Sequence, residues 1–96
     1  MKTILALTDY YYPAIRAGGV PLALKTMMLW LKNDYEFRVI THNFDVGDNH
    51  PMPNISYNTW SMVDNVPVRY LSADESLAQI IQQTPHDMIY LNSLFG

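Results

Sequence analysis

Three short, largely apolar runs, each ending in polar residues, constrain this chain most. They are ILAL (residues 4–7), FRVI (37–40) and MIYL (88–91), followed by TDY, THN and NSL. A run that is apolar on successive residues is typical of a strand buried on both faces, as in a parallel sheet. Because parallel strands need long crossover connections, we expect helices between these runs.

The first such helix is predicted from about residue 20 to Lys32, with Pro21 in its first turn, where the missing N–H costs nothing. Leu22 and Leu29 fall on the side opposite the apolar face. They are either isolated surface leucines or a second buried face against a partner domain. The residues predicted to share the broad apolar face are Val20, Ala23, Leu24, Met27, Met28, Trp30 and Leu31.

A second helix is predicted over ADESLAQIIQQT (73–84). Ser72 and Glu75 form a capping box in front of it, and Pro85 follows its end. Its predicted buried residues are Ala73, Leu77, Ile80 and Ile81.

The segment between the second run and this helix reads as a hairpin. Residues 44–54 are rich in Asp, Asn, Gly and Pro and are therefore predicted to be irregular. Two short strands follow, joined near VDN (63–65), with Trp60 and Tyr70 as large packing residues. The whole order predicts an α/β fold, an open, doubly wound, mostly parallel sheet with a short antiparallel hairpin.

Composition narrows the function classes. The chain has 96 residues, enough for one small domain, and its net charge of −3 comes with no Lys/Arg cluster. We therefore expect no nucleic-acid partner. Without cysteine there is no disulfide, thiolate nucleophile or cysteine zinc site. The first apolar run is too short for a signal peptide, and no run approaches the roughly 20 residues of a membrane span, so we expect a soluble, cytoplasmic chain.

Polar residues gather at the predicted strand ends, where open α/β sheets bind their ligands. The alternative is that strand ends are polar because they meet water. His42 is the only histidine that we take as a cleft candidate, since His50 and His86 are expected at the surface. The polar residues at the three ends are Asp9, Tyr10, Tyr11, Tyr12 and Arg16, then Thr41, His42, Asn43 and Asp45, and finally Asn92 and Ser93.

Gly18 and Gly19 directly precede the first helix. Free backbone N–H groups and the helix dipole favour an anion there, and the missing Cβ atoms let a phosphate approach. The alternative is a tight turn that needs positive φ. Neither a G-x-G-x-x-G fingerprint nor a P-loop is present, so nothing indicates an NAD enzyme or a kinase.

The segments YYYPAIRAGGVP, YEFRVITHNFDVGD and DMIYLNSLFG together resemble the opening of glycosyltransferase family 4. The resemblance is strongest over residues 5–48 and 86–95. Members of that family are retaining enzymes with two Rossmann-like domains that face each other across a cleft, the GT-B architecture.

The resemblance implies a role for the polar residues. Gly18 and Gly19 would lie against the diphosphate of a nucleotide-sugar donor, which is a substrate, so that no cofactor and no metal are implied. Arg16 would suit a phosphate or sugar-acid group through bidentate hydrogen bonds. The acceptor, a sugar or a lipid-linked sugar, would face Tyr11, Tyr12, Arg16, His42, Asp45, Asn92 and Ser93.

The chain also departs from the family. The glutamate pair spaced eight apart is missing, because the only glutamates are Glu36 and Glu75, and no catalytic residue can be assigned. We therefore expect residues 1–96 to be a single truncated Rossmann-like domain, the first half of the acceptor domain, inactive alone. Such a piece is expected to self-associate through the helix at 20–32 or the last strand.

The alternative is a self-contained small α/β module for ligand binding or interaction. A flavodoxin-like receiver fits less well, because only one carboxylate, Asp9, follows the first strand.

Overall fold

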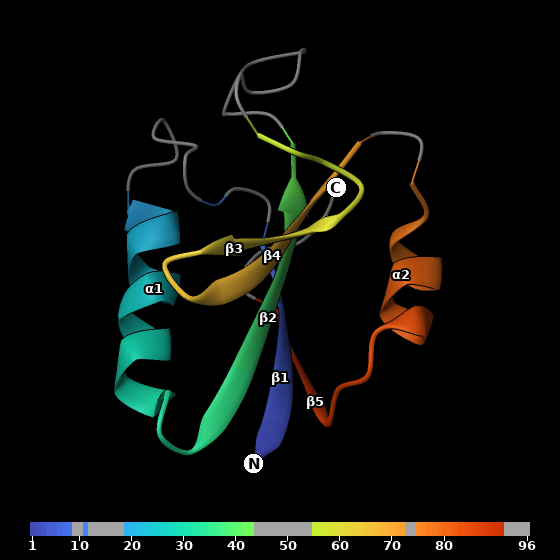
Figure 1. The fold of residues 1–96 in the computed structure, drawn as a ribbon. Coiled ribbons are helices and arrows are strands. Elements are labelled where there is room, and N and C mark those ends of the chain that lie inside the picture. The colour runs from blue at the N-terminus through green and yellow to red at the C-terminus, as the bar shows by residue number, and fades with distance from the viewer. Residues whose placement is uncertain (9–10, 12–18, 44–54, 73–74, 92–96) are drawn as a thin grey trace.

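The computed structural model describes residues 1–8, 11, 19–43, 55–72 and 75–91. Two helices and five strands make up this part of the chain (Figure 1). In chain order they are β1 (Lys2–Leu7), α1 (Gly19–Leu31), β2 (Tyr35–His42), β3 (Trp60–Val63), β4 (Val66–Leu71), α2 (Leu77–Gln83) and β5 (Met88–Leu91).

All five strands form one sheet in the order β3-β4-β2-β1-β5. β1 is paired in parallel on both edges, with β2 and with β5, and β2 pairs in parallel with β4. Only β3 and β4 are antiparallel. The expected mixed α/β fold with a mostly parallel sheet and one antiparallel pair is thus confirmed.

The core lies on both faces of the sheet, because successive side chains of a strand point to opposite faces. Figure 1 shows α1 and α2 on opposite sides of the sheet. The cluster on the α1 side consists of Ile4, Ala6, Tyr11, Leu24, Met28, Phe37, Val39, Val68 and Tyr70. The cluster on the α2 side consists of Leu5, Leu7, Ile40, Leu71 and Ile80.

Helix α1 packs the predicted residues Leu24, Met27, Met28 and Leu31 against the core, but not Trp30. Leu24 and Met28 are buried one turn apart, whereas Trp30 is 81% exposed, so its assignment to the buried face was wrong. Trp30 lies two residues beyond Met28, which is about 200° around the helix and thus away from the sheet. Leu29 is exposed, which leaves both interpretations of it open, and the side chain of Leu22 lies outside the described residues.

Helix α2 begins later than predicted. Its first residue is Leu77, and its N-cap is Ser76, whose Oγ accepts a hydrogen bond from the Gln79 N–H at 3.3 Å. The predicted capping box of Ser72 and Glu75 is therefore wrong. Glu75 pairs instead with an arginine of β4, and two hydrogen bonds between oppositely charged groups are stronger than the single bond of the carboxylate to a backbone N–H.

The predicted hairpin is confirmed, and its turn falls at Asp64 and Asn65, which have φ values of 49° and 68°. Two consecutive residues with positive φ are the signature of a type I′ turn, whose twist matches that of the flanking strands. Asp64 also accepts a salt bridge from Lys25 of α1, at 2.8 Å, which ties the turn to the helix.

The turn predicts how substitutions at Asn65 affect stability. Asn65→Gly should leave the free energy of unfolding unchanged or raise it slightly, whereas Asn65→Val should lower it by about 1–2 kcal/mol, because a β-branched residue resists positive φ. Urea denaturation measures both. Asn33→Val is the matched control at an exposed turn residue without positive φ. Equal losses from the two valine variants would contradict the assignment.

Tyr70 gives the core a predictable response to alkaline pH. It is 2% exposed, and burial raises its pKa to about 12 from 10.0. Because the folded pKa is the higher one, its contribution to stability is complete below pH 10 and is lost as the pH rises towards 12. The loss should be on the order of 2 kcal/mol. Tyr70→Phe should flatten this part of the stability curve, and an unchanged slope would contradict the burial effect.

Candidate functional site

The parallel strands end at one edge of the sheet, and α1 starts there (Figure 1). This follows from the connectivity, since α1 links the end of β1 to the start of the parallel β2 and must run back along the sheet. Backbone bonds extend the ladders past the strand ends. Thr8 N–H donates to the Ile40 carbonyl, and Asn43 N–H donates to the Leu71 carbonyl, both at 3.1 Å. These bonds hold the residues just after β1 and β2 in place at the edge where α1 starts.

Thr41 is the polar side chain at this edge whose hydrogen bonding is incomplete. It is 0% exposed, and among the described residues its Oγ1 has no hydrogen-bond partner. It alternates with Val39 and Phe37, so its side chain lies on the α1 face of the sheet. A buried hydroxyl without a partner costs about 1–3 kcal/mol, and an ordered water, an ion or a ligand can supply the missing bond.

The strand order indicates where along this edge a ligand would be expected. From β1 the chain crosses to β2 on one side, and from β4 it returns through α2 to β5 on the other side of β1. In open α/β sheets ligands bind where the direction of the connections reverses, outside the carboxyl ends of the strands. That point is between β1 and β5, where Leu7 is paired with Leu91.

The structure places only some of the residues named from the sequence. Gly19 is the first residue of α1, and Tyr11 is 1% exposed within the core cluster on the α1 side. His42 is half-buried at the end of β2, but it is paired with Leu71 and lies on the α2 face, opposite Thr41. Gly18, Tyr12, Arg16, Asp45, Asn92 and Ser93 lie outside the described residues. The structure thus brings Gly19 and Thr41 to one edge, and the remaining site residues stay predictions.

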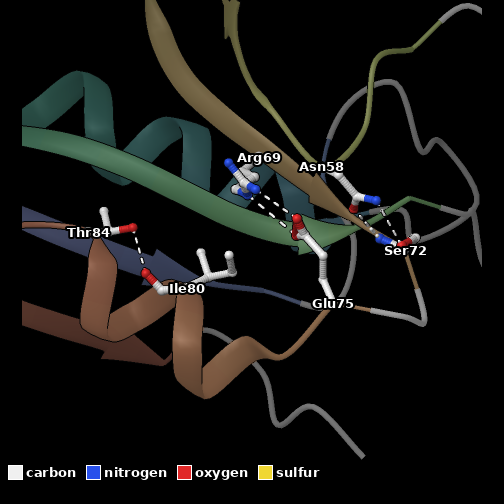
Figure 2. A network of polar contacts seen from close by, with 6 residues as sticks. All are labelled: Asn58, Arg69, Ser72, Glu75, Ile80 and Thr84. Atoms are coloured by element: carbon white, nitrogen blue, oxygen red, sulfur yellow. Dashed lines mark hydrogen bonds and ion pairs between the residues drawn. The ribbon is translucent and has the colours of Figure 1, made fainter.

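A polar clamp that the sequence analysis missed holds the link between β4 and α2 (Figure 2). The Arg69 guanidinium donates two hydrogen bonds to the Glu75 carboxylate, at 2.7 and 3.4 Å. Both side chains are less than 20% exposed, at 17% and 16%. The guanidinium carbon also lies 6.0 Å from the centre of the Trp60 ring. Only the Ser72–Glu75 spacing could have drawn attention to this segment, and it suggested a cap instead.

A second contact fixes the start of the same link. The Asn58 side chain accepts a hydrogen bond from Ser72 N–H and donates one to Ser72 Oγ, both at 3.0 Å. Asn58 N–H also donates to the Tyr70 carbonyl at 2.8 Å, and its φ of 61° is one that asparagine tolerates. These contacts explain why Ser72 does not cap the helix.

Within the part of the chain that the structure describes, no three His, Asp or Glu side chains gather as metal ligands. Neither α1 nor α2, the described helices, has the length and apolar character needed to cross a membrane. No protein family, curated protein or solved structure matches this chain.

The orphaned hydroxyl yields a stability test. Thr41→Val should raise the free energy of unfolding of the ligand-free chain by about 1 kcal/mol. The substitution removes an unpaired buried hydroxyl and replaces it with a methyl group of similar volume. Thr84→Val is the matched control. Thr84 is also buried, but its Oγ1 donates to the Ile80 carbonyl at 2.7 Å (Figure 2), so this change should lower stability. Thermal and urea unfolding measure both, and losses of the same sign and size would show that Thr41 is satisfied.

Proposed function

We propose that this chain belongs to a retaining glycosyltransferase that uses a nucleotide-sugar donor, as the first half of a Rossmann-like acceptor domain. The observation that carries the proposal is that the Thr41 hydroxyl, without a partner among the described residues, lies at the carboxyl edge of the sheet, the edge at which α1 starts with Gly19. A polar ligand at this edge would meet both the missing hydrogen-bond partner and the free N–H groups of the helix. The resemblance to glycosyltransferase family 4 supplies the kind of ligand, a diphosphate.

The strand order supports the same proposal. With the antiparallel β3 set aside, the order β4-β2-β1-β5 corresponds to the 3-2-1-4 arrangement that opens a Rossmann-type sheet. α1 on one face and α2 on the other, as the two core clusters indicate, support a doubly wound arrangement. The carboxyl ends of β1 and β5 would then face the acceptor.

The chemistry expected at such a site is front-face displacement of the nucleoside diphosphate, with retention at the sugar carbon. Negative charge develops on the leaving diphosphate, and the N-terminus of α1 would stabilise it. Gly18 and Gly19 would let the phosphates approach the backbone, and Arg16 would hold an anionic group of the acceptor. This chain supplies no assigned catalytic residue, and we propose that the chain alone does not turn over.

The proposal is tested by titrating the ¹⁵N-labelled chain with uridine, guanosine and adenosine diphosphates and with inorganic pyrophosphate. At least one nucleotide should shift the amide resonances of Gly19 and Thr41 saturably, with a Kd on the order of 1 mM for a half-site. Thr41→Val should weaken this binding severalfold, because the hydroxyl partner is lost, whereas Thr84→Val should not.

Two results would contradict the proposal. One is that no diphosphate shifts these amides, which would favour the self-contained binding module. The other is that the shifts occur but Thr41→Val binds as well as the unchanged chain, so that the hydroxyl has no part in the site.

A further inference from the structure

The pairing of β2 with β4 stops halfway along β2. The register runs from Val39↔Val68 to His42↔Leu71, while β2 itself begins at Tyr35. β1 pairs with β2 over the full length from Tyr35 to Ile40. The first half of β2 therefore has a partner on one edge only, although it lies inside the sheet order.

The directions of the backbone N–H and C=O groups show which of them are unpaired at this open edge. The Ile40 carbonyl accepts from Thr8 after β1, whereas Asn43 N–H donates to Leu71 of β4. Because residues along a strand direct their N–H and C=O groups alternately to either side, even-numbered residues of β2 face β1 and odd-numbered ones face β4. Tyr35 and Phe37 thus direct their backbone groups into the unpaired side, where the described residues supply no partner.

Pro67 explains why the ladder ends there. Continuing the register by two residues would place the Phe37 carbonyl opposite the nitrogen of residue 67. Proline has no N–H to donate, so this bond cannot form. The hairpin turn is instead drawn towards α1 by the Lys25–Asp64 salt bridge (Figure 1).

A groove of about 480 Å³ lies at this position, within the range of small-ligand and peptide sites. One wall is β2, including Tyr35 and Phe37, and the others come from α1 and the hairpin, including Met28, Leu29 and Val66. It is far from the carboxyl edge, because its β2 residues are the first four of that strand.

The charged side chains that line the groove indicate which kind of partner would bind there. Among the residues that the structure describes, three basic and two acidic side chains line the groove, so the lining favours an acidic partner over a basic one. Lys25 and Asp64 satisfy each other, while among the described residues Arg38 has no ion-pair partner. Arg38 is paired with Leu5 and therefore lies on the α2 face, opposite Phe37.

We infer that the groove binds an extended peptide segment of a partner protein, which adds as a short strand to the open edge of β2. Its backbone donates to the Phe37 carbonyl and accepts from the Phe37 N–H, as in other cases of strand addition. Its side chains alternate, because those on the α1 face meet Met28 and Leu29 and those on the other face lie beside Arg38. The peptide therefore carries apolar and acidic residues in alternation.

The test uses the 96-residue chain and the probe peptide acetyl-Val-Glu-Val-Glu-Val-amide. Binding should slow hydrogen exchange of the Phe37 amide about tenfold, since exchange reports the new backbone bond. The same peptide with its internal amides N-methylated should not bind. Protection of the β5 amides instead of Phe37 would overturn the proposal, and so would equal binding of the N-methylated peptide.

Two sets of variants separate the contribution of charge to peptide binding from that of backbone pairing. Arg38→Glu should weaken peptide binding about fivefold, and Lys2→Glu, an exposed lysine outside the groove, should leave it unchanged. Pro67→Val supplies an N–H opposite the Phe37 carbonyl. The new amide of residue 67 should bond to this carbonyl and be protected from hydrogen exchange, and the peptide should no longer bind. Unaltered peptide affinity in Pro67→Val would overturn the proposal. Protection of the Phe37 amide that rises with protein concentration in the absence of peptide would also overturn it, because a second copy of the chain would then occupy the groove.

Discussion

Parallel pairing on both edges of β1 is the constraint on which the rest of the structure depends. With β2 on one side and β5 on the other, β1 can satisfy its backbone groups only inside a sheet, and its residues from Ile4 to Leu7 are buried on both faces. Two apolar faces require two covering helices, so α1 and α2 must lie on opposite sides. The same arrangement brings the strand ends and the start of α1 to one edge, where the candidate site lies.

The sheet also contains two places where its own pairing is incomplete. β5 is an edge strand whose four residues, Met88–Leu91, are all exposed although their sequence is apolar throughout. A strand of this composition is typical of the middle of a parallel sheet, and an open apolar edge favours association. The first half of β2 is the second place, and there the cause is local, because Pro67 cannot donate the next bond of the ladder.

Much of the fold could be predicted because its signals are local. Largely apolar runs predicted β1, β2 and β5, and Asp64-Asn65 predicted the hairpin turn. The errors arose where a distant residue competed with a local pattern. Glu75 had the spacing of a capping box, but the buried guanidinium of Arg69 offers a stronger partner. Trp30 fell within a broad apolar face, of which Leu24, Met27, Met28 and Leu31 do pack into the core, but Trp30 itself points away from the sheet.

For the candidate site, the chain order of residue types was enough to expect polar strand ends and a glycine at the start of α1, because both depend on neighbouring residues. It could not show that Thr41 keeps a buried hydroxyl without a partner, that His42 lies on the opposite face, or that β2 has an open edge beside Pro67. Those features depend on strand order and register between residues distant in sequence. A shift of one residue in that register would exchange every side chain between the two faces.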